Sequence, residues 1–161
     1  MAENILILCG AANPAEKTSS IARASGSTLG LVNTCLDPSQ MMISGKRIEE
    51  MRDWGGVSYH AFDEPLAVGS AIAQLAGYAD AVVVVRLDDW AERLVRFHAE
   101  KSEYIDAELT SVTSVLSAHL TDLVLVSRPA TNGKDRGAEL HRRMLAEFGP
   151  HLTRTVDLTR G

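Results

Sequence analysis

The stretch Ile5–Ser19, ILILCGAANPAEKTS, decides the fold that this sequence predicts. An apolar run is followed by a glycine, a short polar segment and Lys-Thr-Ser, which is the order of a strand, a phosphate-binding loop and a helix. In the motif GxxxxGK[ST], loop N–H groups surround the phosphates, the Lys neutralises them, and the Ser or Thr hydroxyl holds magnesium. The stretch therefore predicts nucleotide-binding ancestry, with Gly10, Lys17, Thr18 and Ser19 as candidate phosphate-binding residues.

The loop departs from this motif in three ways. Six residues separate Gly10 from Lys17, where the motif has five. Glu16 replaces the glycine that precedes the Lys, and Pro14 has no N–H to donate. A carboxylate that faces a phosphate repels it. We therefore predict a degenerate phosphate-binding loop, with kinase activity absent or very weak.

Composition limits the class of protein. The chain has 161 residues, 45% hydrophobic and 23% charged, which fits a single domain over residues 1–161 with a core of its own. A formal net charge of −5 argues against a nonspecific nucleic-acid binder, since such binding depends on Lys and Arg. Small molecules or proteins are the expected partners.

The cysteines, histidines and apolar runs point to a cytoplasmic protein. Cys9 and Cys35 lie in apolar segments without metal-binding spacing and are interpreted as reduced core thiols. The five His residues show no paired metal spacing, so no metal site is predicted. No apolar run approaches the roughly 18 residues of a membrane span, and the N-terminus lacks the basic region of a signal peptide.

Short apolar runs alternate with longer amphipathic stretches along the whole chain. Strands are predicted at Ile5–Cys9, Leu29–Thr34, Val57–Phe62, Ala81–Val85, Leu123–Ser127 and Thr153–Leu158. Helices are predicted at Thr18–Ser25, Ser39–Trp54, Pro65–Ala79, Asp88–Glu100, Glu103–His119 and Lys134–Phe148. This alternation predicts an α/β fold with a doubly wound, mainly parallel sheet. Ligands then bind beyond the carboxyl ends of the strands, with the phosphate-binding loop after a central first strand.

The order of short motifs resembles one known family. Val32-Asn33-Thr34 ends the second strand, Arg47-Ile48 follows, VVVVRLDDWAERL covers residues 82–94, and HRRMLAEFG ends at Gly149. In this order the chain resembles the adenosylcobinamide kinase / adenosylcobinamide-phosphate guanylyltransferase family of cobalamin biosynthesis. The resemblance implies a P-loop-NTPase-like fold, ATP or GTP with magnesium as cofactors, a corrinoid-like substrate and assembly into homo-oligomers.

The departures from the family fall on the residues that carry its chemistry. The family's His that accepts the guanylyl group corresponds to Met51, whose thioether cannot replace a nucleophilic nitrogen. The family's strand-end Asp corresponds to Val85, with Arg86 after it, and its Glu corresponds to Pro129 or Ala130. We therefore predict that guanylyl transfer is absent, and no catalytic residue is assigned.

Three acids remain as candidates, each with an ordinary structural alternative. Asp63 follows a strand, where it would either contact a nucleotide hydroxyl or cap the next helix. Asp88 and Asp89 are candidate magnesium-side acids displaced from the strand end, and acids are also favourable in the first turn of a helix.

Two aromatic residues and a basic cluster are weaker candidates. Trp54 and Trp90 would stack on a base or pack in the core. Arg142 and Arg143, next to His141, would meet a phosphate or lie on a solvated helix surface.

Three functions stay open from the sequence. The first is an enzyme that transfers a phosphoryl group to a cobinamide-like alcohol. The second is a non-catalytic relative that binds a nucleotide, a corrinoid or a protein partner, and the lost residues favour it. The third is an unrelated doubly wound nucleotide-binding domain. Self-association is also predicted, because the apolar face of the Glu103–His119 helix and Trp54 offer more hydrophobic surface than a small sheet needs to cover.

Overall fold

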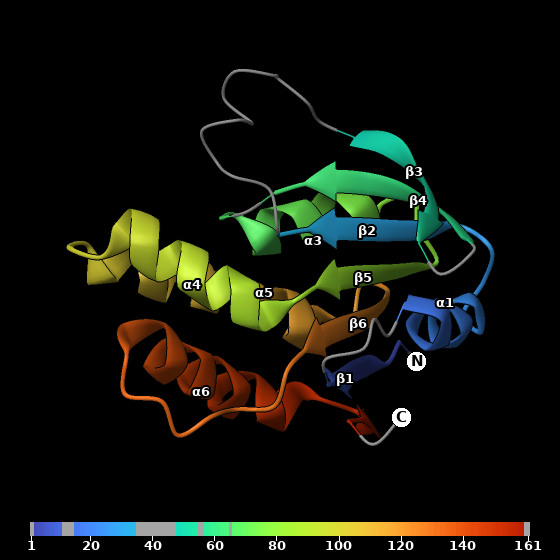
Figure 1. The fold of residues 1–161 in the computed structure, drawn as a ribbon. Coiled ribbons are helices and arrows are strands. Elements are labelled where there is room, and N and C mark those ends of the chain that lie inside the picture. The colour runs from blue at the N-terminus through green and yellow to red at the C-terminus, as the bar shows by residue number, and fades with distance from the viewer. Residues whose placement is uncertain (1, 11–14, 35–47, 55–56, 65, 160–161) are drawn as a thin grey trace.

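The computed structural model describes residues 2–10, 15–34, 48–54, 57–64 and 66–159. In chain order the elements are β1 (Asn4–Cys9), α1 (Ala15–Arg23), β2 (Leu29–Asn33), β3 (Ile48–Trp54), β4 (Val57–Asp63), α3 (Val68–Ala76), β5 (Ala81–Val85), α4 (Leu87–His98), α5 (Ser102–Ala118), β6 (Asp122–Ser127), α6 (Arg136–Phe148), a 3-10 turn (Gly149–His151) and β7 (Arg154–Leu158) (Figure 1). None of the helices in these residues has the length and apolar character that crossing a membrane needs.

The strands form one seven-stranded sheet in the order β3-β4-β2-β5-β6-β1-β7. Neighbouring strands run parallel, except that β3 is antiparallel to β4. All six predicted strands are present, and the predicted α/β class with a mainly parallel sheet is confirmed. The near-continuous apolar runs of β1 and β5 fit a sheet that is buried on both faces.

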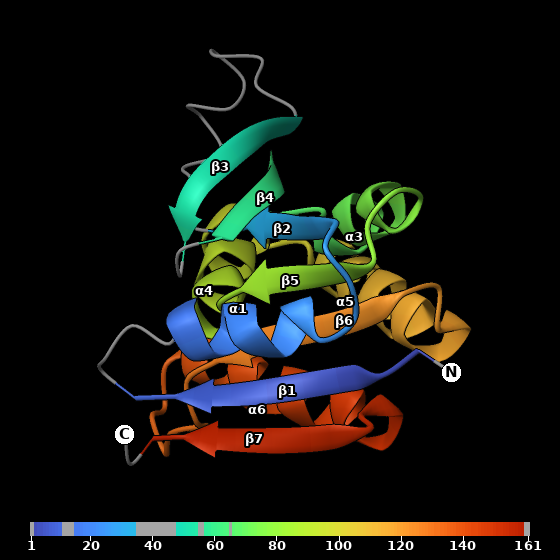
Figure 2. The ribbon, with the colours of Figure 1, turned by 90° about the vertical axis from the view of Figure 1, so that its right-hand side faces the viewer.

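Helices cover both faces of this sheet. Figure 2 shows α1 on one face and α3, α4, α5 and α6 on the other. The strands alternate accordingly: Ile7 and Val83 lie in the core on the α1 side, while Leu6 and Val82 lie in the core under the other four helices. Two cores separated by one sheet are the result of the doubly wound connection.

The largest error of the sequence analysis is the helix predicted over Ser39–Trp54. Ile48–Trp54 is the edge strand β3, paired with β4. The pairing with a neighbouring strand overrides local helical spacing, because strand preference depends on the pairing partner more than on the segment itself. The remaining part of the predicted helix, residues 39–47, lies outside the described residues.

Three smaller predictions also need correction. β1 lies between β6 and β7, second from one edge of the sheet, so it is not central. The helix predicted from Pro65 begins at Val68, because the Glu64 carboxylate accepts hydrogen bonds from the N–H groups of Leu66 and Ala67 just before it. The first helix begins at Ala15, earlier than the predicted Thr18.

The apolar face of α5 is not free for self-association. Ile105, Leu109, Val112 and Leu116 are between 0% and 8% exposed and belong to the protein's own core. α5 packs against α3, α4 and α6, which cover that face. The prediction of an exposed hydrophobic surface on α5 is therefore wrong. Oligomer formation stays a prediction from the family resemblance.

Candidate functional site

The candidate site is the carboxyl edge of the sheet. The paired residues Asn33 and Val85, Val85 and Val126, and Leu8 and Ser127 show that β1, β2, β5 and β6 end at nearly the same level. In open α/β sheets, ligands bind beyond this edge. The residues that directly follow these strands therefore share one rim, and they are Gly10, Thr34, Arg86 and Arg128.

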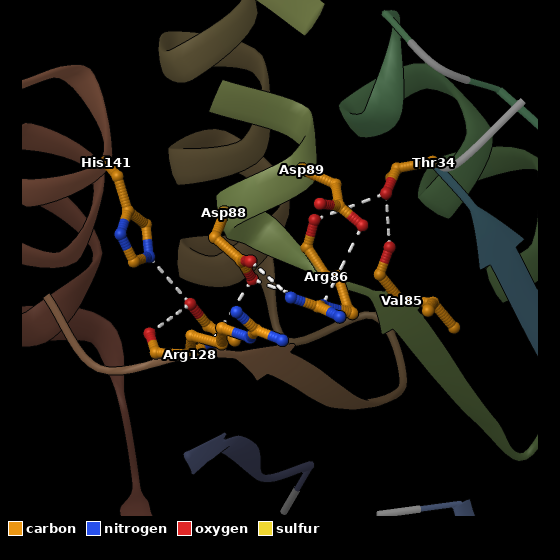
Figure 3. Close-up of polar contacts among 8 residues, drawn as sticks. Thr34, Val85, Arg86, Asp88, Asp89, Arg128 and His141 are labelled. Atoms are coloured by element: carbon orange, nitrogen blue, oxygen red, sulfur yellow. Dashed lines mark hydrogen bonds and ion pairs between the residues drawn. The ribbon is translucent and has the colours of Figure 1, made fainter. Parts of the chain in front are cut away.

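Arg86 forms the corner between β5 and α4 in a rare backbone conformation. Its φ is 74° and its ψ is 98°, a region that L-residues seldom adopt and that costs about 1–3 kcal/mol. The buried Thr34 holds this corner from the end of β2. Its hydroxyl donates to the carbonyl oxygen of Val85 and lies 3.2 Å from that of Arg86 (Figure 3). The strained corner is thus fixed by a neighbouring strand.

Asp88 and Asp89, the predicted magnesium-side acids, face Arg86. The Nη2 of Arg86 donates to Oδ2 of Asp88 at 2.6 Å, and its Nε lies 3.7 Å from Oδ2 of Asp89. The backbone N–H of Arg128 donates to Oδ1 of Asp88 at 3.1 Å. Figure 3 shows Asp88 between the Arg86 guanidinium and the Arg128 backbone. Both acids are therefore already paired with a protein cation.

The pKa values of this pair shift in opposite directions. Burial raises the pKa of Asp88, but the hydrogen bonds from Arg86 and from the N–H of Arg128 outweigh it, and the pKa ends below its ordinary value of 3.8. The hydrogen bond to Asp88 raises the pKa of Arg86 against the opposing effect of burial. The ion pair is fully charged at neutral pH.

His141 and Ser127 form a second polar contact at this edge. His141 is 5% exposed, and its Nε2 lies 2.7 Å from the Oγ of Ser127. The Ser127 hydroxyl donates its proton to the carbonyl oxygen of Arg128 at 2.8 Å, so Nε2 of His141 must be the donor to Ser127. Burial lowers the pKa of His141, although the Asp88 charge opposes this. A His that donates to Ser cannot activate it as a nucleophile, so the pair holds the β6–α6 connection.

Cys9, at the end of β1, is buried at 1% exposure, as expected for a core thiol. Burial raises the pKa of its thiol most strongly, while the positive charges of Arg86 and Arg128 partly oppose this. These charges reach Cys9 because the ends of β1, β5 and β6 lie at one rim. A thiol with a raised pKa is unreactive at neutral pH.

The β1–α1 unit contrasts with this paired edge. Glu16 and Lys17 are exposed in the first turn of α1. Thr18 is 0% exposed, and its Oγ1 has no hydrogen-bond partner within the described part of the chain. The hydroxyl of Ser19, in contrast, accepts a hydrogen bond of 2.8 Å from the buried Tyr59 of β4. Among the predicted phosphate-binding side chains that the structure describes, Lys17 and Thr18 are the two that make no hydrogen bond or ion pair within the described residues.

The weaker candidates have structural roles. Trp90 is completely buried and its Nε1 donates to the carbonyl of Leu66 at 2.9 Å, so it packs in the core and cannot stack on a base. Arg142 donates to the carbonyls of Thr131 and Gly133 and thereby holds the loop before α6. Arg143 pairs with Asp106 and Glu147 on the helix surface.

The structure describes only the backbone at three of the predicted positions, and a fourth, Gly10, has no side chain. Asp63 ends β4 opposite Asn33, and Met51 lies in β3 opposite Tyr59, but the side chains of Asp63, Met51 and Trp54 lie outside the described part. Gly10 directly follows β1, and a Cβ at this position would lie 3.4 Å from the carbonyl oxygen of Thr159. The residues between Gly10 and α1 are likewise outside the description.

The residues at this rim fit a phosphate group better than a magnesium ion. No group of three or more metal-binding side chains occurs among the residues that the structure describes. Asp88 has both carboxylate oxygens bound to N–H groups, and Asp89 faces the same guanidinium. The groups without an acceptor in the described part of the chain are donors: the Arg86 guanidinium has a free terminal nitrogen, and the Thr18 hydroxyl has no partner.

A groove of about 650 Å³ lies elsewhere, between α5 and α6. Hydroxyl groups dominate its walls, but Thr113 donates to the carbonyl of Leu109 and Ser117 donates to that of Thr113. These hydroxyls serve their own helix, so the groove offers few free donors to a ligand. The carboxyl edge remains the stronger candidate.

Lys17, Thr18, Asp88 and Asp89 are candidates from the sequence, whereas Arg128 and the role of Arg86 emerge only from the structure. Both arginines directly follow an apolar strand, which is the signal that could have identified them. Their spatial relation depends on β5 and β6 being neighbours in the sheet. Strand order is not visible in the sequence.

No family model matches this chain, and no curated protein matches its sequence. Among solved structures, a KaiC-like protein from the hyperthermophilic archaeon Pyrococcus horikoshii OT3 is similar to it. The two chains are 12% identical with a TM-score of 0.46, and the match covers 86% of this chain and 69% of that one. Likeness at this level transfers neither ligand nor activity.

Proposed function

We propose that this protein binds the phosphate groups of a nucleotide or corrinoid-like ligand at the carboxyl edge of its sheet, without catalysing phosphoryl or guanylyl transfer. It is then a degenerate relative of the adenosylcobinamide kinase / guanylyltransferase family that keeps binding and has lost chemistry. The observation that carries the proposal is the buried hydroxyl of Thr18, which lacks a partner in the described structure and directly follows Lys17. An unpaired buried hydroxyl costs about 1–3 kcal/mol, and a bound phosphate oxygen would remove that cost.

The position of Thr18 supports a phosphate as that partner. α1 follows β1 at the carboxyl edge, so its first N–H groups and the positive end of its dipole face the rim. Lys17 and Arg86 add positive charge there, and Lys17 is exposed enough to reach a ligand. A donor hydroxyl, a helix N-terminus and cations together select an anion.

The loss of catalysis is supported by two substitutions. Met51 stands where the family has its nucleophilic His, and Val85, with Arg86 after it, stands where it has a strand-end acid. Phosphoryl transfer needs metal ions or cations that stabilise the charge developing on the transferred group. Here the acids that follow β5, Asp88 and Asp89, are held by Arg86.

Calorimetric titration with ATP and GTP tests the binding. We expect binding weaker than low micromolar, because Glu16 places a negative charge beside Lys17. Lys17→Ala should weaken binding, and Glu16→Gln, which removes one charge at the same side-chain size, should strengthen it. Failure of the wild-type protein to bind ATP, GTP or pyrophosphate at millimolar concentration contradicts the proposal.

Labelled GTP and ATP test the absence of chemistry. Incubation of the purified protein with labelled GTP should leave no covalent guanylyl group on any residue, and ATP should not be consumed in the presence of a cobinamide-like alcohol. A phosphoramidate adduct on a His would show that guanylyl transfer survives. Homo-oligomer formation rests on the resemblance alone, and light scattering at micromolar concentration decides it.

A further inference from the structure

At the corner formed by Arg86, the carboxylate oxygens that a metal ion would need as ligands already accept hydrogen bonds from the protein. Magnesium takes carboxylate and phosphate oxygens at about 2.0–2.1 Å in near-octahedral geometry. Oδ2 of Asp88 instead holds the guanidinium of Arg86 at 2.6 Å, and Oδ1 holds the N–H of Arg128 at 3.1 Å. A metal ion would have to displace Arg86 to reach Asp88.

Arg86 has donors left over for a ligand. A guanidinium carries five N–H donors, and the contacts with Asp88 and Asp89 use Nε and one of the two terminal nitrogens. Within the described residues, no protein contact of Nη1 is present. The side chain is 27% exposed, so this nitrogen can be reached from the rim. Arginine donors of this kind match two oxygens of a phosphate group.

The backbone at Arg86 gives a second, independent indication. A non-glycine residue with φ of 74° is strained, and strain of this kind concentrates at functional sites. The Thr34 hydroxyl donates to the carbonyl oxygen of Val85 and lies 3.2 Å from that of Arg86, so it holds the strained residue from both sides. The corner fixes the guanidinium at the end of β5, on the same rim as Gly10 and Arg128.

We infer that Arg86 replaces a divalent cation in this protein, so that the phosphate groups of a nucleotide or other diphosphate ester bind without magnesium. This inference rests on the proposed phosphate binding and specifies its chemistry. Asp88 and Asp89 then position Arg86 and do not hold a metal. Removal of the guanidinium would leave two neighbouring carboxylates, which repel a phosphate unless a divalent cation binds between them.

The first test uses pyrophosphate and the wild-type protein. Titration calorimetry in EDTA and in excess magnesium should give the same affinity within about threefold, since a bound metal ion would change it far more. Binding that requires magnesium overturns the inference and leaves the proposed function standing. No binding in either buffer rejects the proposed function itself, so the two failures are distinguishable.

The second test uses Arg86→Gly, because glycine adopts positive φ without strain and the variant removes the side chain with its guanidinium. In EDTA its affinity for pyrophosphate should fall by at least about tenfold, as the loss of a charge-assisted hydrogen bond implies. Magnesium should restore most of the affinity. Arg86→Lys is the matched control that keeps the charge, and it should remain independent of magnesium.

A third measurement needs no phosphate ligand. Mn²⁺ titration followed by electron paramagnetic resonance should detect no site at this edge in the wild-type protein and one new site in Arg86→Gly. Asp88→Asn in the Arg86→Gly background should abolish that site. A wild-type Mn²⁺ site that Asp88→Asn removes, or an Arg86→Gly protein with native circular dichroism that gains no site, contradicts the inference.

Discussion

Two strand-to-helix corners at the same edge of the sheet differ in whether their polar groups have hydrogen-bond partners. At the β5–α4 corner, Arg86, Asp88 and Asp89 bind one another, and Thr34 binds the backbone. At the β1–α1 corner, Thr18 keeps a buried hydroxyl without a partner in the described structure. The polar groups of the first corner satisfy one another, whereas the hydroxyl of the second has no acceptor. In the proposed function, the first corner takes the place of a metal ion and the second binds the ligand.

The largest expected effect comes from opening the paired corner. Asp88→Ala leaves Nη2 of Arg86 and the Arg128 N–H without their acceptor, so the free energy of unfolding should fall by about 2 kcal/mol at pH 7. Asp88→Asn, which keeps one acceptor oxygen, should lose less. Urea denaturation measures both.

The pH dependence of this effect follows from the lowered pKa of Asp88. The folded protein releases the Asp88 proton more readily than the unfolded chain does, so the stabilisation is complete above the ordinary pKa of 3.8 and disappears as the pH falls below it. Asp88→Ala and the wild-type protein should therefore converge in stability at the acid end of the range. A constant difference at all pH values would show that Asp88 acts without its charge.

The buried parallel strands could be predicted from the sequence, whereas the edge strand β3 could not. Apolar runs such as AVVVV in Ala81–Val85 have few alternatives to a buried strand. Ile48–Trp54 is polar and lies at the sheet edge, so its preference depends on β4. The pair Gly55-Gly56 between Trp54 and Val57 was the available signal, because Gly-Gly between two strand-compatible segments is typical of a two-residue hairpin loop.

The candidate site could be predicted only by residue type. Lys17 and Thr18 were identified because their order follows a known motif. The pairing of Arg86 with Asp88 depends on side-chain rotation around a corner with positive φ, and the contact with Arg128 depends on β5 and β6 being neighbours. Neither is encoded in local spacing.

Glu108 resembles Thr18 in having a buried oxygen without a hydrogen-bond partner in the described structure. Unlike Thr18, it can gain or lose a proton. Burial, with the nearby charge of Glu64 as a smaller cause, raises the pKa of Glu108 to about 7 from 4.5. The folded protein binds this proton more tightly than the unfolded chain, so stability falls as the pH rises from about 4.5 through 7.

Glu108→Gln should therefore stabilise the protein at pH 8, by about 1–2 kcal/mol because solvent screens this partly exposed group, and should have little effect at pH 4.5. Thermal or urea unfolding at the two pH values measures this. Glu103→Gln, at an exposed position of the same helix, is the control and should not show this gain. Equal stability of Glu108→Gln and wild type at pH 8 would contradict the prediction.

Thr18, unlike Glu108, does not titrate. The cost of its missing hydrogen bond is therefore tested with a ligand and with a mutation. Thr18→Val keeps the shape and removes the unpaired oxygen, and it should stabilise the free protein by about 1 kcal/mol while weakening pyrophosphate binding. Thr113→Val is the control, because its hydroxyl donates to the carbonyl of Leu109 at 2.9 Å. That variant should gain no stability and bind pyrophosphate normally. Loss of stability in Thr18→Val would mean that Thr18 has a structural partner.

The smallest effect is expected at Arg143, which the sequence left open as a phosphate contact. Its Nη1 lies 2.8 Å from Asp106 and its Nε 3.2 Å from Glu147, but the side chain is 44% exposed. Exposed pairs of this kind contribute at most about 1 kcal/mol, and salt screens them further. Arg143→Ala should therefore change stability by less than about 0.5 kcal/mol, less so in high salt, and should leave pyrophosphate affinity unchanged. Because Arg143 lies on α6 and pairs with α5, weaker pyrophosphate binding in this variant would move the anion site away from the rim formed by Gly10, Arg86 and Arg128.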